Sequence, residues 1–129
     1  MIEAEMAARL PKLEQLSAKA LTTLFSDSAV ARADAIERAL PELGNKHFKL
    51  MDNVYRELRG RGIDGQAALL ALLDHGSSEV RLNAASLALE FSPSLAEPVL
   101  QSLAQLDGLV RYDAAGVLEQ WKKGALQFP

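Results

Sequence analysis

The chain has 129 residues, a formal net charge of −3 and an isoelectric point of about 5.4. Its length suits one domain with a sizeable core, and its mildly acidic charge disfavours nucleic acid as a partner, because nucleic-acid binders usually carry a strongly basic face. The absence of cysteine excludes disulfides and thiolate chemistry, and no apolar run is long enough to span a membrane. The acidic first residues are unlike a signal peptide, so we expect a cytoplasmic protein.

The N-terminal half predicts three helices. Apolar residues recur every three or four positions over residues 6–24 and again over 29–40. The Ser-Asp-Ser segment at 26–28 can cap a helix, so we expect a break between two helices there. A third helix is expected over 44–60, from a Gly-Asn pair to a glycine stop. We expect residues 1–62 to form an irregular helical layer.

The C-terminal half contains a repeat. Residues 66–73 are apolar on every side, which predicts a buried helix. Segments 79–88 and 109–118, which lie 30 residues apart, then share Val-Arg-x-x-Ala-Ala in register. A period of this length is typical of stacked helical hairpins. We therefore predict an all-α fold, a short HEAT-like α-α superhelix of about six to seven helices, in a single domain over 1–129 with the repeats at 63–124 and a frayed tail at 125–129.

Two arginines occupy equivalent positions in the repeat. Arg81 and Arg111 each fall among small apolar residues on a helical wheel, near a helix N-terminus whose dipole disfavours a cation. Each guanidinium therefore needs a partner, either a carboxylate or the carbonyls that end a neighbouring helix. The candidate carboxylates are Asp74, Asp107 and Asp113. We interpret both arginines as structural links between repeats, although they could instead line a concave surface and hold an anionic group.

Two further features predict partner binding. Residues 41–62 carry five basic and three acidic groups, and one side of the expected helix gathers a basic stripe of Lys46, Lys49, Asn53 and Arg56. This stripe is either a solvated helix face or a surface for an acidic partner, where rim charges raise the association rate. Tyr112 stands where the first repeat has Leu82, which puts an aromatic side chain at a groove edge or at the end of the stack. Trp121 is expected to close that end.

No residue pattern predicts catalysis or a metal site. The chain has two histidines and no cysteine, and His47 falls on the apolar side of its helix, where a hydrogen-bonded core residue is the simpler interpretation. Neither a Gly-x-Ser-x-Gly elbow nor a phosphate-binding glycine loop is present. We therefore predict no enzyme activity, no cofactor and no metal ligand.

The repeat motif resembles HEAT-like repeats of the phycobilisome-lyase type. Over residues 28–126 the chain is also similar to a small bacterial HEAT-like domain family of unknown function. That similarity rests on Asn53, Glu57-Leu58-Arg59-Gly60-Arg61-Gly62, the Leu69, Leu72, Leu73 and His75 pattern, Val80-Arg81-Leu82 with Ala84-Ala85, and Trp121-Lys122-Lys123-Gly124 with Leu126. The resemblance implies a helical-repeat fold and a link to immunity-type partners in bacterial toxin systems, and it brings no catalytic residues.

These observations favour a non-enzymatic protein-interaction module that binds another protein with an acidic surface and is itself a monomer or a weak homodimer. One alternative is an immunity protein that blocks a bacterial toxin. Another is a HEAT-like DNA-binding or base-excision protein whose groove is lined by Arg81, Arg111, Asp113 and Trp121.

Overall fold

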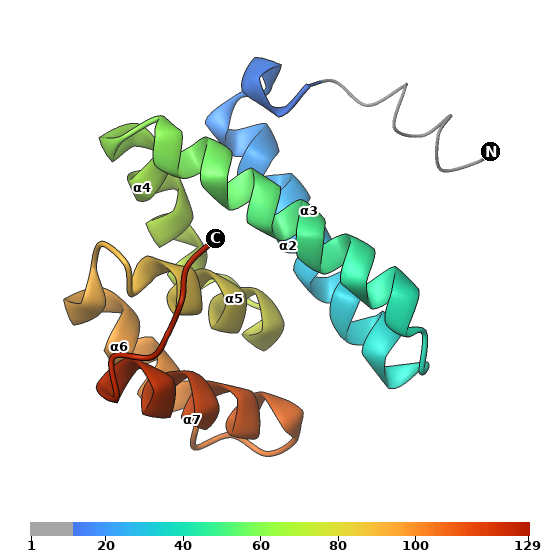
Figure 1. Ribbon diagram of the computed structural model, residues 1–129, viewed down its shortest axis with the longest axis vertical. Coiled ribbons are helices and arrows are strands. Elements are labelled where there is room, and N and C mark those ends of the chain that lie inside the picture. The colour runs from blue at the N-terminus through green and yellow to red at the C-terminus, as the bar shows by residue number, and fades with distance from the viewer. Residues whose placement is uncertain (1–11) are drawn as a thin grey trace.

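Six α-helices and two short 3₁₀ turns make up the described part of the computed structural model, residues 12–129 (Figure 1). In chain order they are η1 (Leu13–Gln15), α2 (Ala18–Glu37), α3 (Pro41–Gly60), α4 (Ile63–Ala71), η2 (Leu72–Asp74), α5 (Ser78–Ala88), α6 (Pro93–Leu103) and α7 (Leu109–Lys122). Within these residues there is no β-strand, and none of the helices is long and apolar enough to cross a membrane. The predicted all-α fold is confirmed.

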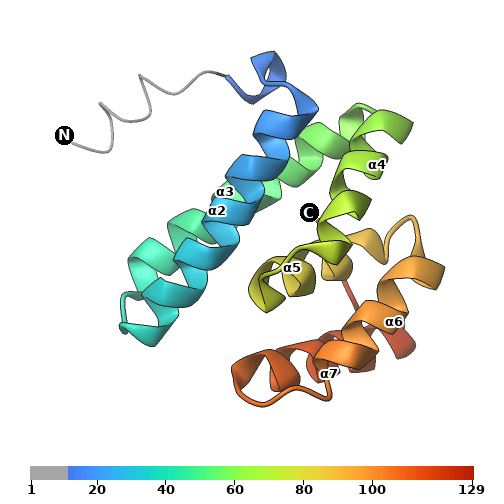
Figure 2. The same cartoon turned by 180° about the vertical axis from the view of Figure 1, so that it is seen from behind.

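Helix α5 lies at the centre of the molecule. It sits between the long antiparallel hairpin of α2 and α3 and the shorter hairpin of α6 and α7, and the view from behind shows the same order (Figures 1 and 2). Its residues Ala84, Ala85 and Ala88 are fully buried. Small side chains let neighbouring helices approach closely, so the alanines of the repeat motif are what allow α5 to be covered from several directions.

Helix α2 runs without interruption through residues 26–28, so the expected break there is wrong. The Ser26 hydroxyl donates a hydrogen bond to the carbonyl oxygen of Thr22 at 2.9 Å, and Ser28 is only 3% exposed. Both serines are therefore used inside a helix rather than at its end. The real cap is Ser17, whose hydroxyl accepts from the Ala20 amide at 3.0 Å. The part of the expected apolar stripe at residues 6–11 lies outside the described residues.

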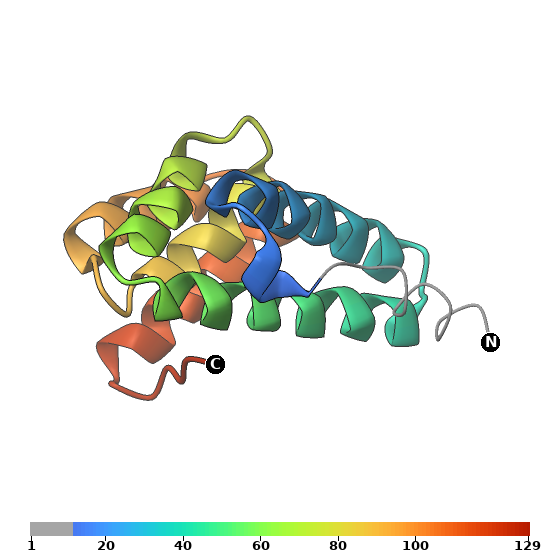
Figure 3. The ribbon, with the colours of Figure 1, turned by 90° about the horizontal axis from the view of Figure 1, so that it is seen from above.

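Helix α3 begins at Pro41, three residues before the expected start. Proline has no amide proton and a fixed φ, which suits the first position of a helix. Gly44 is buried inside the first turns, where Ile36 and Ala35 of α2 lie at ordinary contact distance from its missing side chain. Seen from above, α2 and α3 run side by side (Figure 3). The described part of residues 1–62 is thus a regular hairpin rather than an irregular layer.

The last residues fold back onto the molecule, which corrects the expectation of a frayed tail at 125–129. Gly124 has a φ of 70°, and this left-handed turn ends α7 and reverses the chain. Leu126 and Phe128 then pack against the core. The Phe128 ring meets the Trp121 ring edge-on, with 6.5 Å between ring centroids. This C-terminal segment, residues 124–129, runs from the end of α7 past α5 (Figure 1).

A close backbone contact fixes the turn between α3 and α4. A side chain at Gly65 would place its first carbon 1.7 Å from the carbonyl oxygen of Leu58, so only glycine fits there. Gly62 begins the turn with a φ of 70°. Arg61 strengthens the same corner, because its guanidinium pairs with Glu57 at 2.9 Å and donates to the carbonyl oxygen of Leu13 at 3.2 Å.

Replacing Gly65 with alanine is expected to lower the free energy of unfolding by about 2 kcal/mol or more, because the start of α4 must move away from α3. Urea denaturation followed by circular dichroism measures the change. Gly116→Ala is the matched control, since its added methyl would meet open space within α7. The free energy of unfolding of this control should rise by about 0.5–1 kcal/mol. Equal effects of the two substitutions would contradict the close contact at Gly65.

Candidate functional site

A groove lies between α3 on one side and α5 and α7 on the other. Two adjoining hollows of about 290 and about 480 Å³ form it, and both are lined by Phe48, Asn83 and Ser86. The space exists because α5 packs against α2, whereas α3 approaches α5 less closely. We call it the α3–α7 groove. Its lining includes Arg32 of α2, Phe48 and Asp52 of α3, Asn83 and Ser86 of α5, Tyr112, Asp113 and Gly116 of α7, and Leu126 and Phe128 of the C-terminal segment.

Aromatic side chains stand along this groove on both sides. Phe48 of α3 is 43% exposed and Tyr112 of α7 is 70% exposed, which is high for rings of this size. The Arg32 guanidinium lies over the Phe48 ring, 4.8 Å from its centroid. Phe128 lines the smaller hollow at the other end of the groove, together with Met51. The groove therefore presents aromatic surface to solvent from two helices that are far apart in sequence.

Two carboxyl groups beside the groove are partly buried, and neither forms an ion pair with a described residue. Burial raises the pKa of the Asp52 carboxyl, and the charges of Arg56 and Arg32 oppose that rise. Burial also raises the pKa of the Glu79 carboxyl, the nearby charge of Asp113 adds to the rise, and Arg32 opposes it. Partly buried carboxylates that have no direct cation partner are typical of binding sites.

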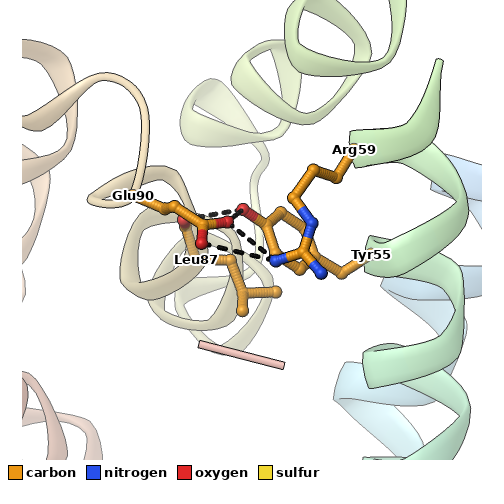
Figure 4. Close-up of polar contacts among 4 residues, drawn as sticks. All are labelled: Tyr55, Arg59, Leu87 and Glu90. Carbon is orange, nitrogen blue, oxygen red and sulfur yellow. Dashed lines mark hydrogen bonds and ion pairs between the residues drawn. The ribbon is translucent and has the colours of Figure 1, made fainter. Parts of the chain in front are cut away.

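One polar cluster joins α3 to α5 at the end of the groove (Figure 4). The single hydroxyl proton of the buried Tyr55 is shared between the Glu90 carboxylate and the carbonyl oxygen of Leu87, which lies farther away at 3.4 Å. The Arg59 guanidinium donates to both oxygens of Glu90, at 3.0 and 3.3 Å, and lies 5.3 Å from the centroid of the Tyr55 ring. Burial, followed by the hydrogen bond to Glu90, raises the pKa of the Tyr55 hydroxyl well above 10.

The predicted basic stripe lies outside this groove. Lys46, Lys49, Asn53 and Arg56 are all exposed on another side of α3. Arg56 donates to the amide oxygen of Asn53 at 3.0 Å, so these two side chains are joined on the surface. Of the five residues predicted to bind a partner, Tyr112 lines the groove, and the other four do not.

The two repeat arginines are not equivalent in the structure. Arg81 donates to the carbonyl oxygens of His75 and Gly76, at 2.7 and 3.2 Å, and so it binds the turn before its own helix. This agrees with the carbonyl alternative and contradicts the three candidate carboxylates. Arg111 is exposed and forms no hydrogen bond or ion pair with a described residue. Neither arginine links one repeat to the next.

Trp121 joins two helices of the same hairpin. Its indole nitrogen donates to the Glu97 carboxylate of α6 at 2.6 Å, while its ring meets Phe128. The four residues named for a DNA-binding groove are therefore dispersed. Arg81 borders a separate hollow beside Leu103, and Asp113 lines the α3–α7 groove. Among residues 12–129 no three His, Asp or Glu side chains gather in a way that could hold a metal ion.

Sequence reasoning did not find the central residues of the groove. Phe48 follows His47 on the apolar side of α3, and Asp52 comes one turn later, so a carboxylate beside an apolar stripe is the signal that the sequence offers. Arg32 and Glu79 gave no such signal, because only the packing of α2 against α5 brings them together. Phe128 was missed because a short apolar segment after a glycine carries no helical period.

Comparison with known families identifies the fold group. Residues 19–120 match the model described as "Domain of unknown function (DUF2019)". The chain belongs to this family. The DUF2019 domain is also similar to the crystal structure of the protein RPA1889 from Rhodopseudomonas palustris CGA009, with a TM-score of 0.84 and 27% sequence identity over 93% of this chain and 100% of that one. Comparison with curated protein sequences gives no match.

Replacing Tyr55 with phenylalanine should lower the stability of the DUF2019 domain by about 1 kcal/mol at pH 7, through loss of its hydrogen bonds. A raised tyrosine pKa also makes the wild type lose stability as the pH rises above about 10, because the unfolded state ionises first. Tyr55→Phe lacks this loss. The difference in free energy of unfolding between the two proteins, measured by urea titration, should therefore become smaller between pH 8 and pH 11. Tyr112→Phe, a change at an exposed ring, is the control and should show no narrowing.

Replacing Asp52 with asparagine should stabilise the domain at pH 7. A raised carboxyl pKa means that ionised Asp52 opposes folding at neutral pH, and that this penalty is absent below about pH 4, where the group is protonated in both states. The gain should be about a few tenths of a kcal/mol, since solvent screens the group, and it should vanish at pH 3. Asp34→Asn, at an exposed residue paired with Arg38, should bring no gain. A less stable Asp52→Asn protein at pH 7 would contradict the assignment.

Proposed function

We propose that this DUF2019 domain is a non-enzymatic protein-interaction module that binds its partner in the α3–α7 groove. The observation that carries the proposal is the pair of exposed aromatic side chains, Phe48 and Tyr112, on opposite sides of a groove with hollows of about 290 and about 480 Å³. Exposed aromatic residues around a concave surface are typical of the energetic centre of protein interfaces.

We further infer that the hairpins α4–α5 and α6–α7 are two HEAT-like repeats. The motif residues support this, because Val80 and Val110 are both buried and so are Ala84 and Ala114. Helices α5 and α7 pack against each other, as the second helices of adjacent repeats do in a solenoid.

The position after the shared valine separates the two copies. Leu82 of α5 is 6% exposed, while its counterpart Tyr112 of α7 is exposed. The exposed positions of a helix are usually polar. An aromatic side chain there supports a surface that is kept open for a partner.

The polar groups inside the groove support binding rather than catalysis. The Ser86 hydroxyl donates to the carbonyl oxygen of Leu82 at 2.6 Å, and the Asn83 amide donates to the carbonyl oxygen of Glu79 at 2.8 Å. Both side chains are thus hydrogen-bonded to their own helix. A nucleophilic serine needs a hydrogen bond to a base instead.

The test is direct binding to a native partner. The full chain would be tagged in its source organism, the proteins that copurify in stoichiometric amount identified, and the purified partner titrated by calorimetry against variants. Tyr112→Ala should weaken binding by about 2 kcal/mol, as expected for an aromatic residue at an interface centre.

Lys49→Glu, on the basic stripe, is the matched comparison and should change the affinity little. If Lys49→Glu abolishes binding while Tyr112→Ala does not, the site lies on the stripe and the groove proposal is wrong. Absence of any stoichiometric protein partner would contradict the module itself. A toxin as the partner would specify the domain as an immunity protein.

A further inference from the structure

The α3–α7 groove has an excess of negative charge. Asp52 of α3, Glu79 of α5 and Asp113 of α7 lie in or beside it, and Arg32 of α2 is the cation that faces them. Arg56 also acts on Asp52 but belongs to the outer side of α3. A partner that places a cation here would meet carboxylates that form no ion pair with any residue of the described range 12–129, so charge complementarity favours a basic occupant.

The molecule already contains one example of such binding. The Arg32 guanidinium lies 4.8 Å from the centroid of the Phe48 ring, a typical cation–π geometry. Tyr112 offers a second aromatic face on the opposite side of the groove, and its ring is 70% exposed. Asp113 of α7 lines the same hollow as Tyr112, so an aromatic face and a carboxylate border one space.

The groove also contains an example of the backbone it accepts. The C-terminal segment has no helical residue after Gly124, yet it is packed into the groove through Leu126 and Phe128. Leu126 lines the larger hollow, and residues 127–129 line the smaller one. A non-helical segment with apolar side chains at alternate positions therefore fits against α5.

We propose that the open part of this groove, around Tyr112 and Asp113, binds an extended segment of the partner protein that carries arginine or lysine. The cationic side chain would pair with Asp113 and stack on Tyr112, while apolar neighbours would pack as Leu126 does. The inference rests on the proposed function and specifies its partner. It differs from the acidic partner expected from the sequence, because that expectation concerned the stripe outside the groove.

The test titrates the isotope-labelled full chain with two unlabelled octapeptides. Gly-Arg-Leu-Arg-Leu-Arg-Leu-Gly is the probe, and its twin carries glutamate in place of arginine. Titrations followed by amide chemical shifts should show that the arginine peptide perturbs Asn83, Tyr112 and Asp113, while the glutamate twin does not. Binding should weaken as salt is added. Equal binding of both peptides, or shifts confined to the stripe around Lys49, would overturn the inference.

A matched pair of substitutions separates a specific site from general attraction to an acidic protein. Asp113→Asn should lower the affinity for the arginine peptide by about fivefold or more. Asp107→Asn, which changes an exposed carboxylate before α7, should leave that affinity unchanged. Equal losses of affinity in the two variants would contradict a specific site at Asp113. If Tyr112→Ala abolishes binding of the native partner while the arginine peptide fails to bind, this inference falls and the proposed function stands.

Discussion

The hydrogen bond from the buried Tyr55 to the solvent-accessible Glu90 sets the distance between α3 and α5, and the groove depends on that distance. A tyrosine side chain is long, and its hydroxyl reaches the end of α5 while its ring fills the space between the helices. Arg59 completes the cluster, because its positive charge pairs with the negative charge of the Glu90 carboxylate. The helices are thus held apart at this end, and the space beyond it is open between Phe48 and Asn83. The same residues that stabilise the fold therefore leave room for a ligand.

The fold could be predicted from the sequence where local pattern and final packing agree. The valines and alanines of α5 and α7 follow a helical period, and the structure buries them as that period requires. The prediction failed at Ser26 and Ser28, because a serine can either cap a helix or bond back within one. The choice was made by the packing of α2 along the full length of α3, which no local window contains.

The candidate site was less predictable, because its residues come from four helices and a terminal segment. A helical wheel shows which side of α3 is exposed, and Lys49 lies there as expected. It does not show that Asp52 lines a hollow together with Phe128, or that this hollow adjoins the one lined by Tyr112. Tyr112 could be predicted because the equivalent position of the first repeat is a leucine, Leu82. The difference between the two repeats therefore pointed to an exposed aromatic residue, which the overall composition did not.

Trp121 gives the domain an internal optical probe. It is the chain's single tryptophan, its indole nitrogen is bound to Glu97, and its ring touches Phe128 where the C-terminal segment enters the groove. Indole emission responds to the polarity and hydrogen bonding around the ring, and lifting Phe128 away would expose one side of it to water. Movement of that segment can therefore be followed in the unlabelled protein, separately from unfolding of the helices.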